Sequence, residues 1–160
     1  TTLPIGYGNY GYHQFGGTLM LPMAYPGGVS FVDVESGAAA RIDVRDWLHD
    51  VKLLRDKIFV ASDFGSLSYV PWANRWDKGE VATVPVLAGA VGRLHVDGDH
   101  LYAITAHGLA IVSHEARVEK TVALPGLTGG SLSQHSILDV QEGQALVLAA
   151  NEGLRLVDLR

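Results

Sequence analysis

One short pattern recurs four times along the chain. Each copy begins with glycine or serine and continues with an apolar residue, a variable residue, an apolar residue and valine. The valines lie 38, 42 and 45 residues apart, at Val32, Val70, Val112 and Val157. Repeats of roughly 40 to 45 residues that hold several short strands are typical of β-propeller blades. The repeat therefore predicts the architecture before any chemistry is considered.

Two further apolar stretches precede each valine run. They are short, and polar turns such as Arg55-Asp-Lys57 and Asp97-Gly-Asp99 separate them. Short apolar runs bounded by Asp, Gly and Asn are typical of hairpins, and helical periodicity is not sustained anywhere. We therefore expect three strands per repeat, A, B and C from the inside outward.

A fourth strand, D, decides how the ring closes. Three repeats supply one at residues 40–44, 83–86 and 121–124, whereas the last repeat stops at Arg160. The segment Thr2–Ile5 matches Thr83–Val86 in residue type, including the proline, and proline is tolerated on the edge strand of a sheet. We therefore expect residues 1–5 to complete the last blade.

The predicted fold is an all-β propeller of four blade repeats, with the N-terminal strand completing the last blade. The expected blades are residues 10–44, 49–86, 91–124 and 135–160 with 1–5, in a single propeller domain or propeller segment. Known propellers have roughly four to eight blades. The chain would close as a four-bladed ring, pair with a second copy into an eight-bladed ring, or belong to a longer propeller.

The valine runs carry a resemblance to a known family, and this resemblance covers all four repeats. The segments Val29-Ser-Phe-Val-Asp33, Leu109-Ala-Ile-Val-Ser113 and Leu154-Arg-Leu-Val-Asp158 resemble the LVIVD-type repeats of bacterial β-propellers, which are related to the quinoprotein-dehydrogenase-like group. The resemblance implies the fold and carries no catalytic residue. The tryptophan-docking repeat of quinone enzymes and the Gly-His and Trp-Asp pairs of WD40 blades are absent from the sequence.

Composition argues against some classes of partner and bears on the cellular location of the chain. The net charge is −5 and Lys and Arg form no cluster, which argues against nucleic acid and anionic membranes as partners. The sequence has no stretch of 18 or more apolar residues, so no membrane span is predicted. It also has no cysteine, which excludes disulfides and Cys-ligated zinc. The chain opens on Thr1 without a leader, so either a leader was removed or this is a segment of something larger. A periplasmic or secreted location is one expectation.

Histidines at the start of strand A are the first candidate site. Counting back along strand A puts His49 and His135 at equivalent positions near one mouth of the channel, with Tyr10 at the matching step of the first repeat and His13 three residues further on. Three neutral imidazoles would bind a divalent metal such as zinc and leave one coordination position open. The other interpretations are polar residues at a strand junction, or contacts to a small ligand from Tyr10, His49 and His135.

A long loop between strands C and D of the second repeat is the second candidate. It contains Trp72, Arg75 and Trp76, residue types that dominate protein interfaces. The alternative is that the tryptophans fold back over the edge of the blade. This loop is expected on the face opposite the strand-A histidines.

Two functions follow from these candidates. The first is a non-catalytic binding or scaffolding module for a protein or glycan partner, or for a second copy of the chain. The second is a metal-dependent lyase or hydrolase that holds its ion through His13, His49 and His135, with Tyr10 nearby. The sequence contains no recognisable Ser-His-Asp set, carboxylate pair or phosphate-binding glycine loop, which favours the binding module.

Overall fold

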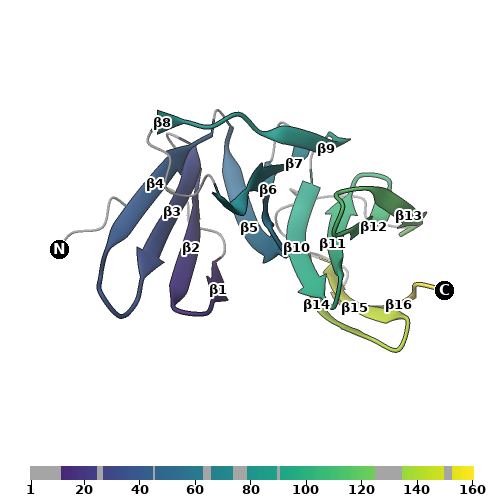
Figure 1. Cartoon of the computed structure of the whole chain (residues 1–160). Coiled ribbons are helices and arrows are strands. Elements are labelled where there is room, and N and C mark those ends of the chain that lie inside the picture. Colours follow the sequence, from purple (N-terminus) through teal and green to yellow (C-terminus); the bar gives the residue numbers. More distant parts are fainter. Residues whose placement is uncertain are drawn as a thin grey trace.

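The computed structural model describes residues 12–24, 27–44, 46–62, 66–73, 79–89, 91–124, 135–149 and 153–160. In these ranges the chain forms strands that assemble into four sheets, with consecutive strands pairing in antiparallel hairpins (Figure 1). The first sheet has the order β1-β2-β3-β4-β8, and its last strand runs parallel to β4. Its strands are β1 (His13–Phe15), β2 (Thr18–Met23), β3 (Gly28–Asp33), β4 (Ala39–Asp43) and β8 (Gly79–Glu80).

The next two sheets have four strands each, and the last has three within the described residues. The second sheet contains β5 (Leu48–Leu54), β6 (Lys57–Ser62), β7 (Ser66–Pro71) and β9 (Val84–Ala88). The third contains β10 (Val91–Asp97), β11 (His100–Thr105), β12 (Gly108–Ser113) and β13 (Val118–Val122). The fourth contains β14 (Ser136–Gln141), β15 (Gln144–Ala149) and β16 (Gly153–Asp158).

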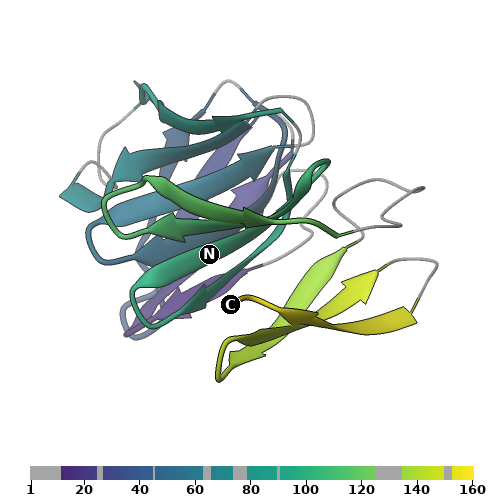
Figure 2. The ribbon, with the colours of Figure 1, turned by 90° about the vertical axis from the view of Figure 1, so that its right-hand side faces the viewer.

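The sheets stand in a row in sequence order, as successive blades do. Figures 1 and 2 place the first and fourth sheets at opposite ends of this row. Strand β5 packs against β2 on one side and β10 on the other, and β10 in turn packs against β14. The all-β propeller of four blade repeats predicted from the sequence is confirmed, and residues 1–5, the predicted closing strand, lie outside the described residues. The described part of the chain contains no helix that is long and apolar enough to cross a membrane.

Three hydrophobic layers hold the sheets together, one between each pair of neighbours. They form because alternate residues of a strand point to opposite faces, so the central strands contribute to two layers at once. The first layer contains Met20, Val29, Phe31, Ile42, Val51, Ile58 and Val70. The second contains Phe59, Leu67, Leu94, Leu101 and Val112, and the third contains Ile104, Leu109, Ile137, Val140 and Val147.

The glycines that open the repeats allow the outer strand to approach closely. Gly28 and Gly108 have φ angles of 155° and 135°, and a Cβ at Gly108 would overlap the carbonyl oxygen of Val122 on β13. Gly153, which opens the fourth repeat, also has positive φ, but a Cβ there would meet no atom within 4 Å. Close approach to a neighbouring strand therefore requires glycine at 28 and 108.

This difference predicts the effect of adding one methyl group. Gly108→Ala should lower the free energy of unfolding by roughly 1–3 kcal/mol, because the methyl group displaces β13 and adds backbone strain. The matched variant Gly153→Ala carries only the strain of its positive φ and should cost less. Urea unfolding of both variants measures the difference, and equal losses would contradict the role given to β13.

Candidate functional site

The inner strands of the four sheets place one polar side chain each at the same level. In each sheet this polar residue pairs across the ladder with the third residue of the second strand. These partners are Met20, Phe59, Tyr102 and Leu146. We call these four polar residues the axial row: His13, Lys52, His95 and Asp139. They come from four sheets, so the row exists only when the whole chain has folded.

Both imidazoles of the axial row are less basic than in water. Burial and the nearby Lys52 ammonium together lower the pKa of His13 to about 4, against the opposing effect of Asp50. Burial also lowers the pKa of His95, although Asp97 and Asp139 act in the opposite direction. At neutral pH the two imidazoles are therefore uncharged, and each offers one hydrogen-bond donor and one acceptor.

The lowered pKa of His13 predicts acid sensitivity. The unfolded chain binds a proton near pH 6.5, whereas the folded chain resists it down to about pH 4, so stability is lost as the pH falls through this window. Because His13 remains partly exposed, we expect a loss of only ~1 kcal/mol. His13→Gln should flatten the dependence of unfolding free energy on pH between about 6.5 and 4. A variant with an unchanged pH profile would contradict this assignment.

His49 and Asp50 join the second sheet to the third at the other end of β5. The register between β5 and β6 is irregular between Leu48 and Asp50, which turns both side chains toward β10. His49 Nε2 lies 3.1 Å from the carbonyl oxygen of Gly92. The Asp50 carboxylate accepts hydrogen bonds from the backbone N–H of Leu94 at 2.8 Å and of Val51 at 2.9 Å. Both side chains are buried, and these contacts satisfy polar groups that burial removes from water.

His135 occupies the corresponding place before β14. Its side chain is buried, and its backbone carbonyl oxygen accepts a hydrogen bond from the N–H of Arg93 at 3.4 Å. His13 lies elsewhere, in the axial row beside Lys52. In the parts of the chain that the structure describes, no three His, Asp or Glu side chains are grouped so that they could hold a metal ion. The zinc site stays a prediction, and Tyr10 lies outside the described residues.

An open groove of about 730 Å³ runs along the opposite end of the inner strands, beside the turns between strands A and B. We call it the turn-end groove; its lining includes His13, Phe15, Leu54, Arg55, Val96 and Asp99. Phe15 is 54% exposed there. Arg55 Nε donates to Asp99 Oδ1 at 2.9 Å, which links the turns of the second and third sheets across the rim.

Trp72 supports the groove from the side of the first core. Its ring meets Phe31 edge-on at 6.1 Å and Phe15 at 6.3 Å between centroids. Its backbone N–H donates to the carbonyl oxygen of Asp56 at 2.7 Å. Trp72 thus covers the first core and buttresses Phe15, while Arg75 and Trp76, the other residues predicted to bind a partner, lie outside the described residues.

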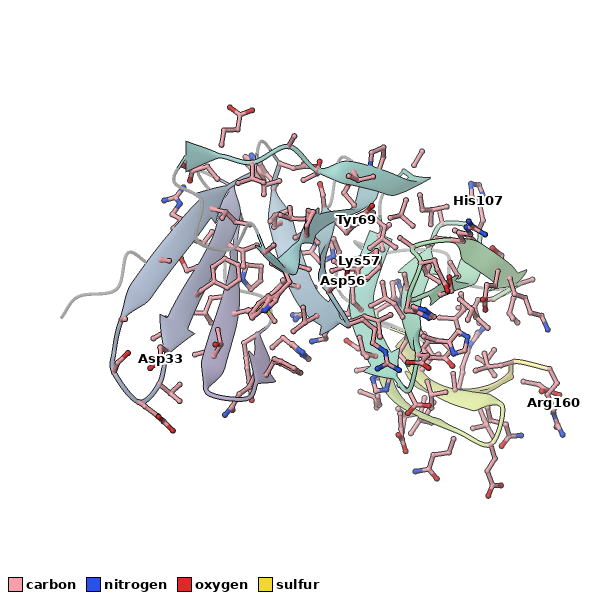
Figure 3. The ribbon with its side chains drawn as sticks, viewed as in Figure 1. Asp33, Asp56, Lys57, Tyr69, His107 and Arg160 are labelled. Carbon is pink, nitrogen blue, oxygen red and sulfur yellow. The ribbon has the colours of Figure 1, made fainter. Side chains whose placement is uncertain are left out.

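A charged and an aromatic side chain also meet on the second sheet, where Tyr69 packs against the second core. The Lys57 ammonium lies 2.8 Å from Asp56 and 5.8 Å from the centre of the Tyr69 ring (Figure 3).

The sequence did not identify Phe15, Arg55 or Asp99 as candidate residues of a binding groove. Polar turns after strand A were its only signal, because the groove arises from three different repeats.

Comparison with solved structures places the fold among β-propellers. The computationally designed protein Ika4 superposes with a TM-score of 0.67 at 9% identity, over 99% of this chain and 96% of that chain. BamB from Moraxella catarrhalis, a β-propeller, superposes with a TM-score of 0.66 at 14% identity, over 92% of this chain and 43% of BamB. The designed protein Ika8 gives a TM-score of 0.60 at 9% identity, over 94% of this chain and 46% of Ika8.

The chain therefore spans nearly all of one of these propellers and less than half of the other two. No protein-family profile and no curated protein sequence matches it. At such low identities the likeness shows the fold alone, so the LVIVD-type resemblance stays an expectation.

Proposed function

We propose that the chain is a non-catalytic β-propeller binding module that holds a protein or glycan partner in the turn-end groove. The observation that carries the proposal is the exposed Phe15 ring on the lining of an open groove whose rim holds the Arg55–Asp99 pair. Large exposed aromatic and arginine side chains are the residues that contribute most to binding energy at protein interfaces. A groove built from several blades also offers one continuous surface to a single partner.

The lining favours a ligand with an apolar face and several hydrogen-bonding groups. Leu54 and Val96 contribute an apolar wall beside Phe15. The uncharged imidazole of His13 can donate to a ligand or accept from it. An aromatic or aliphatic peptide side chain fits this chemistry, and so does the flat face of a sugar ring.

The test selects ligands on the wild-type chain and then removes one aromatic side chain from the lining of the groove. A displayed peptide library and a glycan array are probed with the wild type, and each ligand is measured again on Phe15→Ala. We expect at least a ~10-fold loss of affinity, since Phe15 would be a central contact. Trp47→Ala is the matched control, because Trp47 is equally exposed and lies outside the lining of the groove. Ligands that bind both variants as tightly as the wild type, or a failure to select any, would contradict the proposal.

The alternative function, a metal-dependent lyase or hydrolase, requires His13, His49 and His135 to share one ion. His13 suits a ligand role because its imidazole is uncharged at neutral pH. His49 Nε2, in contrast, already contacts the carbonyl oxygen of Gly92. Zinc titration followed by calorimetry separates the two functions. Stoichiometric zinc binding that His13→Ala abolishes would favour the enzyme, and no binding would leave the module.

A further inference from the structure

The fourth sheet exposes the face that the first three sheets bury. In those sheets the first apolar residue of the repeat is Val29, Leu67 or Leu109, and each is 0% exposed because the next sheet covers it. The counterpart in the fourth sheet is Leu154, which is 62% exposed. Two residues later Phe31 is 0% exposed in the first sheet, whereas its counterpart Leu156 is 65% exposed.

Neighbouring strands extend this apolar surface. Leu154 pairs with Leu148 across the β15–β16 ladder and Leu156 pairs with Leu146, so all four side chains share one face. Leu148 is 36% exposed, and Leu138 in the bulge of β14 is 48% exposed. We call this surface the leucine face: Leu138, Leu146, Leu148, Leu154 and Leu156. Contiguous exposed apolar patches of this kind mark interaction sites.

The repeat itself indicates what covers the leucine face. In every interface of this chain, such a face packs on the opposite face of the following sheet, to which Val70, Val112 and Val157 belong. The first sheet has the equivalent opposite face, where Leu19 pairs with Val32. Among the described residues no sheet precedes it, and it stands at the far end of the row from the leucine face (Figures 1 and 2).

We infer that a second copy of this chain covers the leucine face with its own first sheet. The contact is head-to-tail, and two copies that make it reciprocally close an eight-bladed ring. The longer propellers compared above fit this arrangement, since the chain superposes on just under half of Ika8 and of BamB. The inference does not depend on the proposed ligand groove.

Pairing also completes the axial row. Asp139 pairs with Leu146 and therefore lies on the leucine face. The other three members of the row lie on the corresponding faces of their own sheets, and each of those faces packs on the next sheet. In the ring the next sheet is the first sheet of the second copy, so Asp139 of each copy approaches the inner strand that carries His13 in the other. The single channel of the ring would then be lined by both copies.

Sedimentation velocity over a series of concentrations tests the pairing. We expect the wild type to sediment at twice the chain mass of 17.1 kDa. The double variant Leu154→Glu/Leu156→Glu should raise the dissociation constant at least ~100-fold, because two buried leucines are replaced by charges. Val84→Glu, at an exposed apolar position on the second sheet that belongs to neither surface of the proposed contact, should remain a dimer. A wild type that is monomeric at all concentrations, or a dimer that survives the double variant, would overturn the inference.

A single thiol gives a second readout that does not depend on the double variant folding. The chain contains no cysteine, so Leu156→Cys carries one thiol. It should react slowly with an alkylating reagent at high protein concentration and rapidly after dilution, while Val84→Cys on the exposed edge of the second sheet reacts rapidly at both. Protection of Leu156→Cys at every concentration in a monomer would show that the ring closes within one chain. That result would also overturn the inference.

Discussion

Asp50→Ala is expected to destabilise the chain by about 3 kcal/mol. The substitution leaves the buried N–H groups of Leu94 and Val51 without their carboxylate acceptor, and it removes the partner of Lys52, whose ammonium lies 3.5 Å from Asp50. For a chain of this length the loss corresponds to a fall in melting temperature of roughly 6 to 12 °C. Thermal unfolding followed by circular dichroism measures it.

Two variants separate the buried contact from a general effect of lost charge. Asp50→Asn retains one oxygen acceptor and should lose less stability than Asp50→Ala. Asp56→Ala removes an exposed carboxylate next to Lys57 and should change stability by no more than ~0.5 kcal/mol. If Asp50→Ala melted at the wild-type temperature, the bond from Asp50 to the third sheet would not exist in solution.

Trp72→Ala is the second change with a large expected effect. The indole packs on Phe31 in the first core and on Phe15 at the groove, so truncation should cost about 3 kcal/mol through lost burial and the cavity left behind. Trp47→Ala removes an exposed indole of the same size and should cost less than ~1 kcal/mol. Chemical denaturation of the two variants gives the comparison.

Trp72→Ala also bears on the groove. Without the indole the Phe15 ring loses its edge-on neighbour, so ligands selected on the wild type should bind Trp72→Ala more weakly even under strongly native conditions. Comparable stabilities of Trp72→Ala and Trp47→Ala would indicate that Trp72 does not stabilise the first core. Its loop would then be a partner-binding loop, the other interpretation of the sequence.

The fold was predictable because its determinants are local and repeated. The same residue types recur at blade spacing and have the same role in each sheet. Glycine at 28 and 108 allows close approach of the neighbouring strand, and valine at 70 and 112 is buried between sheets. The short parallel strand β8 was not predicted. Its pairing of Gly79 with Ile42 joins two repeats and leaves no periodic signal.

The site was less predictable because bulges change which side chains face the neighbouring sheet. A regular count along strand A places His49 and His135 at one step near a channel mouth. The irregular register between Leu48 and Asp50 turns His49 toward Gly92, where it is buried, and such a count does not show this contact. A bulge depends on the partner strand, so counting along a single strand does not locate it.

The axial row also depends on long-range pairing. His95 and Asp139 belong to different repeats with unlike residues at the equivalent step. Only the register of each inner strand with its neighbour shows that they lie at the same level.

The most direct test of this account is the titration of His95 by NMR in three versions of the chain. The inner strands of the second, third and fourth sheets converge on His95, so Lys52 and Asp139 should both influence the pKa of its imidazole. We expect the His95 pKa to lie below 6.5 in the wild type, to fall further in Asp139→Asn and to rise in Lys52→Met. A pKa of His95 that is the same in all three proteins would show that these side chains do not share an axis, and it would contradict the arrangement of blades described here.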